Sequence, residues 1–224
     1  MLSEGAQLWW LSKHIKELGD PEYISLMHYG RFFTSLKTQK SAIINCPIEM
    51  FKPEYALTPT TIKIMMMTKK LDVLTIIPNI PTQAGAAAEN AKEQLKLDIK
   101  NWNVEIADEM IDDAFEMFFN NCKNEELRNG MQKAMVRKAH FNCNLMCLKS
   151  QWLKEYMDIL VPTFKELKTK YDDRLFQMSP RAFSYILERF TSLYLFGARE
   201  LGRNVAAFPV IVVKKQAEFN NYKF

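Results

Sequence analysis

The stretch Met178–Pro209, MSPRAFSYILERFTSLYLFGARELGRNVAAFP, carries most of the prediction of the fold. Ser179-Pro180 is a typical helix start, because serine caps the first turn and proline is tolerated at its first position. Apolar side chains then recur every three or four residues over 183–194, while Arg181 and Arg199 fall on the other side. The stretch therefore predicts a long amphipathic helix with a cationic outer face.

Helical spacing recurs along most of the chain. Apolar side chains repeat with this period at about 5–18, 22–37, 84–101, 104–121, 124–140 and 141–160. The exception is 61–77, where two short β-prone runs flank Thr68-Lys69-Lys70 and predict a hairpin. The predicted fold is mainly α, a helical core with a short β-hairpin near 61–77 and extended N- and C-terminal arms.

Three segments are expected along the chain: an N-terminal helical arm at 1–45, a mainly helical core domain at 46–203 and a C-terminal arm at 204–224. With 224 residues, 48% of them hydrophobic and 25% charged, the composition is that of a globular protein. No apolar run approaches the length of a membrane-spanning helix, so no integral membrane contact is expected. The N-terminus lacks the pattern of a secretory signal, and the four cysteines are expected to be reduced.

Positive charge is concentrated in the second half of the chain. Residues 127–224 carry 17 basic and 8 acidic side chains, a net charge of +9, and seven of the eight arginines. Arg31 is the only arginine before them. Because the guanidinium fork binds phosphate in a bidentate manner, this distribution favours a polyanionic partner. A solvated basic face opposite the acidic segment 105–126 is the simpler alternative.

The sequence contains no glycine-rich phosphate loop, dinucleotide fingerprint or nucleophile elbow. The prediction is a protein that is not an enzyme and has no cofactor. Two alternatives carry chemistry. The first is a zinc site, built from Cys122, His140, Cys143 and Cys147, of which the last three share a helical face if the segment is a helix. The second is a metal-dependent nuclease site, built from the clustered carboxylates Asp108, Glu109, Asp112 and Asp113.

Residues 178–208 resemble the core segment of coat proteins from flexuous filamentous RNA viruses, which are related in fold to nucleoproteins of some segmented negative-strand RNA viruses. The resemblance is carried by MS at 178–179, Arg181, AF at 182–183, TS at 191–192, ARE at 198–200 and AA at 206–207. This chain departs from the family at Ser184, near which the family has an aspartate. The resemblance implies a helical core, arms that pack on neighbouring subunits, and RNA in a basic groove near Arg181 and Arg199.

The predicted function is that of an RNA-encapsidating structural protein, a viral nucleoprotein or coat, which self-assembles and binds single-stranded RNA without sequence preference. It would be found in the virion and the host cytoplasm. The candidate RNA-binding residues are Arg128, Arg137, Lys168, Lys170, Arg174, Arg181, Arg189, Arg199 and Arg203. The candidate residues for homo-oligomer formation through the terminal arms are Trp9, Trp10, Val210, Ile211 and Val212. The alternative is a non-enzymatic helical interaction or matrix-like protein that binds an acidic partner or an anionic membrane surface.

Overall fold

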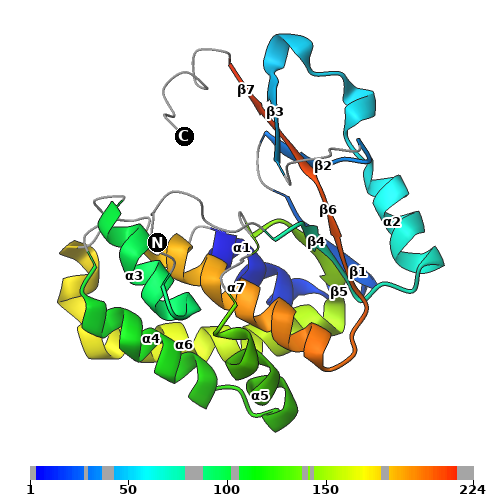
Figure 1. Ribbon diagram of the computed structural model, residues 1–224. Helices are drawn as coiled ribbons and strands as arrows, with labels where there is room; N and C mark the ends of the chain where they lie inside the picture. The colour runs from blue at the N-terminus through cyan, green and yellow to red at the C-terminus, as the bar shows by residue number, and fades with distance from the viewer. Residues whose placement is uncertain are drawn as a thin grey trace.

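The computed structural model describes residues 4–27, 30–36, 43–78, 88–101, 106–137, 141, 144–177 and 182–215. Within these residues the chain forms seven α-helices and seven strands in two mixed sheets (Figure 1). The fold is therefore α/β, and the prediction of a mainly α core with terminal arms is wrong.

Sheet A has the strand order β1-β5-β4-β6. Its strands are β1 (Tyr23–Leu26), β4 (Val73–Ile76), β5 (Met146–Lys149) and β6 (Val205–Phe208). β5 is antiparallel to both β1 and β4, while β4 and β6 are parallel. Consequently β1, β4 and β6 all run in one direction, and their carboxyl ends lie at the same edge of the sheet.

Sheet B is a smaller sheet beyond that edge. It consists of β2 (Arg31–Phe33), β7 (Val210–Lys214) and β3 (Ile43–Pro47), with β7 in the middle. β7 is antiparallel to β2 and parallel to β3. Only Pro209 separates β6 from β7, so the chain passes almost straight from sheet A into sheet B (Figure 1).

Six helices form a layer on one side of sheet A, and α2 (Pro59–Thr68) lies on the other side (Figure 1). The layer contains α1 (Glu4–His14), α3 (Ala91–Asn101), α4 (Asp108–Asn120), α5 (Glu125–Ala134), α6 (Ser150–Gln177) and α7 (Ala182–Glu200). α7 is buried almost throughout, and its Phe190 ring stacks on Phe118 of α4 with centroids 4.1 Å apart. The helix that the opening stretch predicts is thus a core helix of an α/β protein.

Gly130 on α5 and Gly197 on α7 allow the two helices to approach closely. A Cβ atom on Gly197 would lie 2.6 Å from Met131 Cγ and 3.0 Å from the Met131 backbone nitrogen. A Cβ atom on Gly130 would lie 3.0 Å from the Gly197 carbonyl oxygen. Neither position therefore has room for a side chain.

The predicted hairpin at 61–77 is wrong in its first half. Residues 59–68 form α2, because Thr58 caps the helix by accepting a hydrogen bond from the Thr61 N–H and Pro59 occupies the first turn. Met65 and Met66 are also good helix formers. Only the second run forms a strand, β4, and its partners are β5 and β6.

Other differences follow from tertiary packing. Residues 22–37 contain two strands instead of a helix, and 141–160 contains β5 before α6 begins. Pro162 does not end α6, which continues to Gln177 because Leu160, Phe164 and Leu167 are buried against the core on either side of the proline.

In the described part of the chain, the segments predicted as terminal arms do not extend away from the core. β1 pairs with β5, and β7 is paired on both sides, so the segments at the two ends contribute to the central sheets. The boundaries at 45 and 203 stay a prediction. Among the described helices, none is both long and apolar enough to cross a membrane.

Candidate functional site

The first candidate site is the edge of sheet A where β1, β4 and β6 end, at Leu26, Ile76 and Phe208. In open α/β sheets, ligands bind outside the carboxyl ends of parallel strands. Pro209 O accepts a hydrogen bond from Thr34 N at 3.0 Å, and this bond ties the start of sheet B to the edge.

Arg31 is the first residue of β2, in the sheet that continues beyond this edge. Its cross-strand partner is Val212, and Phe33, two residues along β2, lies opposite Val210. Phe33, Val210 and Val212 all belong to the main hydrophobic core, whereas Phe32 on the other face stacks on Phe51. Because side chains alternate along a strand, Arg31 shares the face of β2 that carries Phe33, and it is half-buried there.

Gly30 sets the turn that places Arg31. Its φ of +65° lies in the left-handed region, which side chains other than glycine rarely adopt. A Cβ atom at this position would also lie 2.9 Å from Val213 O. The Gly30 carbonyl accepts a hydrogen bond from Val213 N at 2.7 Å. Glycine is therefore required at the far end of the β2–β7 pair.

Buried polar side chains hold the segment before β5 beneath the same edge. Asn144, with φ of +48°, accepts a hydrogen bond from Thr191 Oγ1 on α7 at 2.9 Å. Tyr156 OH lies 2.9 Å from the same hydroxyl, and burial raises the pKa of Tyr156 so that it stays protonated. Ser192 Oγ accepts a hydrogen bond from Phe141 N at 2.9 Å. This network fixes the backbone that leads into β5 against α7.

A buried ion pair joins α3 to α7 on this side. Arg189, only 4% exposed, donates to Asp98 Oδ2, and Gln94 Nε2 donates to Asp98 Oδ1 at 2.9 Å. Gln94 Oε1 in turn accepts a hydrogen bond from Ala88 N at 3.2 Å. The contacts anchor the backbone at 88 to the helical layer. Residue 88 belongs to the connection between β4 and α3.

A second polar network lies at the opposite edge of sheet A. The two terminal guanidinium nitrogens of Arg203 donate to Glu155, at 2.7 and 2.8 Å, and its Cζ lies 3.6 Å from the centre of the Trp152 ring. Asp72 accepts hydrogen bonds from Lys149 Nζ at 2.8 Å and from Asn204 N at 2.9 Å. Burial opposes the charge on Asp72, but these donors outweigh it and lower its pKa.

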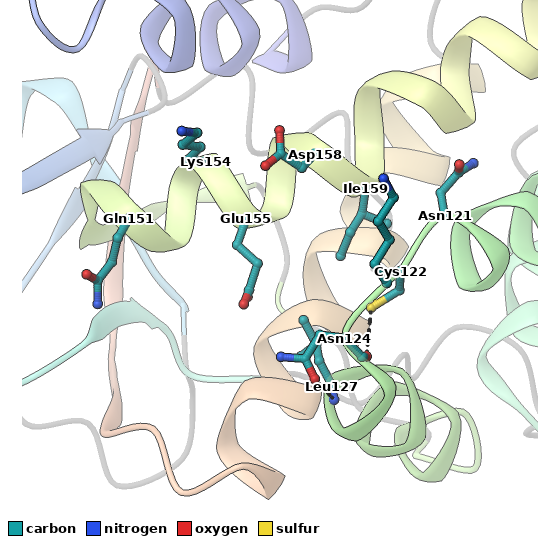
Figure 2. Close-up of a pocket in the computed structure, with 10 residues that line it drawn as sticks. Asn121, Cys122, Asn124, Leu127, Gln151, Lys154, Glu155, Asp158 and Ile159 are labelled. Carbon is teal, nitrogen blue, oxygen red and sulfur yellow. Dashed lines mark hydrogen bonds between the residues drawn. The ribbon is translucent and has the colours of Figure 1, made fainter.

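A hollow of about 590 Å³ lies next to this second network (Figure 2). It lies between the first half of α6 and the turn between α4 and α5. It is therefore near the amino ends of β1, β4 and β6, away from the carboxyl edge of sheet A. Its lining consists of Asn121, Cys122, Lys123, Asn124, Leu127, Gln151, Lys154, Glu155, Asp158 and Ile159. It is a candidate for ligand binding that is separate from the carboxyl ends of the parallel strands.

The predicted RNA-binding residues are scattered instead of lining one groove. Arg189 and Arg203 form the two intramolecular ion pairs above, Arg137 pairs with Glu200 at 2.7 Å, and Lys170 pairs with Asp113. Arg128 lies half-buried on α5, and Lys168 and Arg199 are exposed on α6 and α7. Arg181 and the side chain of Arg174 lie outside the described residues.

The predicted oligomerisation residues separate into two groups. Trp9 and Trp10 are 45% and 50% exposed on α1. Val210, Ile211 and Val212 are buried in β7, the middle strand of sheet B, which has no free edge for strand addition.

The two metal alternatives find no support in the described residues. Among them, no group of three or more histidine, cysteine, aspartate or glutamate side chains is arranged to hold a metal ion. Cys122 follows α4 and Cys147 lies within β5, where burial raises its pKa to about 11; His140 and Cys143 lie outside the described residues. Asp112 pairs with Lys92 and Lys96, each at 2.7 Å, and Asp108 pairs with Lys100 at 3.1 Å.

Comparison with models of protein families assigns the chain to a family. Residues 3–199 match the family described as a domain of unknown function, DUF4422. The chain belongs to this family. A search of curated proteins finds no match.

The fold of this DUF4422 chain is similar to that of the bifunctional glycosyltransferase WbbM in its apo structure. The similarity covers 96% of this chain and 37% of that chain, with a TM-score of 0.66 and 16% sequence identity. The DUF4422 chain thus corresponds to well under half of the length of WbbM.

These comparisons overturn the resemblance to viral coat proteins and nucleoproteins. The family match and the structural likeness both span most of the chain, whereas the resemblance rested on residues 178–208. The predictions of RNA encapsidation, of single-stranded RNA as a partner, of assembly through arms and of a non-enzymatic protein are therefore wrong. The matrix-like alternative is likewise unsupported.

Sequence reasoning missed the residues at the carboxyl edge. Arg31 stood out as the lone arginine of the first half but received no role. The glycine beside it was the available signal, because a Gly-Arg pair between two apolar runs indicates a tight turn that presents a cation. Asn144 carried no such signal, since its role depends on contacts with α7.

Proposed function

We propose that this DUF4422 chain is a glycosyltransferase domain. It would transfer a sugar from a nucleoside-diphosphate sugar to a hydroxyl group of an acceptor. The observation that carries the proposal is the likeness to a glycosyltransferase over 96% of the chain. The carboxyl edge of β1, β4 and β6 supports it, because that edge is where the strand rule locates a ligand.

The reaction sets the chemical needs of the site. The bond between the anomeric carbon and the phosphate oxygen breaks, and the diphosphate leaves with the electron pair. The acceptor oxygen bonds to the anomeric carbon and loses its proton. Negative charge therefore grows on the leaving diphosphate, and a fixed cation beside it stabilises the transition state.

Arg31 is the residue proposed to supply this cation. Among the described residues it is the only arginine in the strands at the carboxyl edge, and none of them offers its guanidinium a carboxylate partner. Its planar fork suits two phosphate oxygens at once. Gly30 and the pairing with Val212 fix its position on β2.

The test is the release of nucleoside diphosphate from a panel of UDP-, GDP-, CDP- and dTDP-sugars. Wild-type protein is expected to release diphosphate from at least one of them. Arg31→Ala is expected to raise the KM for that donor by about 10–100-fold, because one charge-assisted contact is lost. Arg31→Lys keeps the charge without the fork, so its KM is expected to lie between the two.

The matched control is Arg199→Ala. Arg199 is exposed at the end of α7, which leads to the opposite edge of sheet A, so KM is expected to stay unchanged. Absence of release from every sugar nucleotide would contradict the proposed function. Equal KM values for Arg31→Ala and wild type would remove Arg31 from the site and leave the activity standing.

A further inference from the structure

The hollow beside α6 has the dimensions of a binding site and lies apart from the proposed transfer site. Its volume of about 590 Å³ falls within the range of small-molecule sites. α6 begins at Ser150, directly after β5, where Ser150 N donates to Glu22 O beside the start of β1. The hollow therefore adjoins the amino ends of β1, β4 and β6. The proposed site for the sugar nucleotide lies at the carboxyl ends of the same strands.

Glu155 gives the hollow an acceptor with a fixed orientation. Its Oε1 accepts from Arg203 and from Tyr194 OH, at 2.7 and 2.9 Å, and its Oε2 accepts from Arg203 at 2.8 Å. A carboxylate has about four acceptor positions, so one remains on Oε2. Because Arg203 also packs on Trp152, the carboxylate cannot turn away without breaking the network.

Asn124 supplies a donor with an equally fixed orientation. Its Oδ1 caps α5 by accepting from Leu127 N at 3.1 Å, and this leaves the two N–H groups of Nδ2. None of the described residues accepts a hydrogen bond from them. Figure 2 shows the side chains of Glu155 and Asn124 reaching from α6 and from the start of α5 into the same space.

The remaining lining has an apolar floor and a rim of mixed charge. Leu127, Ile159 and Cys122 are buried at the floor. On the rim, Asp158 offsets one of the two lysines, Lys123 and Lys154, and the charge of Glu155 is neutralised by Arg203. The exposed side chain of Gln151 adds a further amide. This balance does not select a strongly charged ligand.

We propose that this hollow binds a neutral glycan and serves as a second carbohydrate site of the domain. A sugar ring combines apolar faces with hydroxyl groups that both donate and accept, so one hydroxyl can bridge Glu155 and Asn124 while the ring covers the floor. The choice of a glycan over another neutral polar ligand rests on the proposed function. Such a site would hold an acceptor or product on the domain while sugar transfer proceeds at the carboxyl edge of sheet A.

The experiment combines an array of neutral oligosaccharides with nitrogen-edited NMR of the ¹⁵N-labelled chain. Glycans that bind on the array, with lactose, maltose and cellobiose as soluble probes, are titrated into the protein. The side-chain amide signals of Asn124 and Gln151 and the indole N–H of Trp152 are expected to shift in a saturable manner. Asn124→Asp keeps a good helix cap but removes the donor, and the glycan Kd is expected to rise about tenfold.

The matched control is Asn129→Asp, which makes the same change at an exposed position of α5 outside the hollow and is expected to leave the Kd unchanged. No binding on the array, or equal Kd values for Asn124→Asp and wild type, would overturn the proposal. Diphosphate release by wild type is measured separately. Release without glycan binding leaves the proposed function standing alone, and glycan binding without release leaves a carbohydrate-binding domain that is not a transferase.

Discussion

At the residue scale, the buried charges of this chain are explained by partners that are distant in sequence. Arg189 faces Asp98 from another helix, and Arg203 faces Glu155. An arginine on a helical wheel looks the same whether it faces solvent or a buried carboxylate. Sequence reasoning therefore assigned both arginines to an RNA groove, although each neutralises a carboxylate within the chain.

Asp98→Asn is expected to lower the free energy of unfolding by about 3–5 kcal/mol, because it removes the carboxylate that pairs with the buried Arg189 guanidinium. Within the described part of the chain, the Nε atom of Arg189 has no hydrogen-bond partner, so its guanidinium is only partly satisfied there. The double variant Asp98→Leu/Arg189→Met is expected to recover most of the loss. Urea denaturation measures both. Asp108→Asn is the control, since its pair with Lys100 is exposed and contributes less than about 1 kcal/mol. A loss for Asp98→Asn as small as that of the control would contradict this account.

Asp72 predicts a dependence of stability on pH. Its pKa in the folded chain lies below the ordinary value of 3.8, so its ionised form stabilises the fold above about pH 4. That contribution is lost as the pH falls through the lowered pKa. The difference in unfolding free energy between wild type and Asp72→Asn is therefore expected to be constant at neutral pH and to shrink below about pH 4. Denaturation curves across this range measure it, with the exposed Asp158→Asn as control. A difference that grows on acidification would have the wrong sign.

At the element scale, helices with a clear amphipathic pattern could be predicted, and short strands could not. The expected helix at 104–121 is confirmed by α4, whose apolar side Met110, Ala114 and Phe118 is buried. β1 alternates between buried and more exposed positions over only four residues, too short a run to outweigh the helical period around it. β5 is buried along Met146–Leu148, and such a strand has no alternation to detect.

Gly197→Ala tests the close approach of α5 and α7. The added methyl group would meet Met131 at 2.6 Å, and part of that contact is with the backbone, which cannot move freely. The free energy of unfolding is expected to fall by about 1–3 kcal/mol, even though alanine has the higher helix propensity. Thermal and urea denaturation measure the change. Asn129→Ala, on the exposed side of α5, is the control and is expected to stay within about 0.5 kcal/mol of wild type. A more stable Gly197→Ala would show that the two helices have room to separate.

At the scale of the whole molecule, the composition predicted a globular chain, but the strand topology could not be predicted from the sequence. Strand order depends on pairings such as Leu26 with Met146 and Val73 with Val205, which join segments more than a hundred residues apart. No local pattern encodes them. The candidate site was missed for the same reason, because it exists only where the ends of β1, β4 and β6 come together. The proposed site lies where β1, β4 and β6 end, next to sheet B, in which Arg31 begins β2.

The most direct test of the central claim is a map of where sugar nucleotides bind, by methyl NMR of protein labelled at isoleucine and valine. Ile76 and Val210 report on the carboxyl edge of sheet A, and Val73 and Val205 report on the opposite edge. At least one UDP-, GDP-, CDP- or dTDP-sugar is expected to shift the Ile76 and Val210 methyl signals and to leave those of Val73 and Val205 in place. Shifts confined to Val73 and Val205, or no shift with any sugar nucleotide, would contradict a donor site at the carboxyl edge.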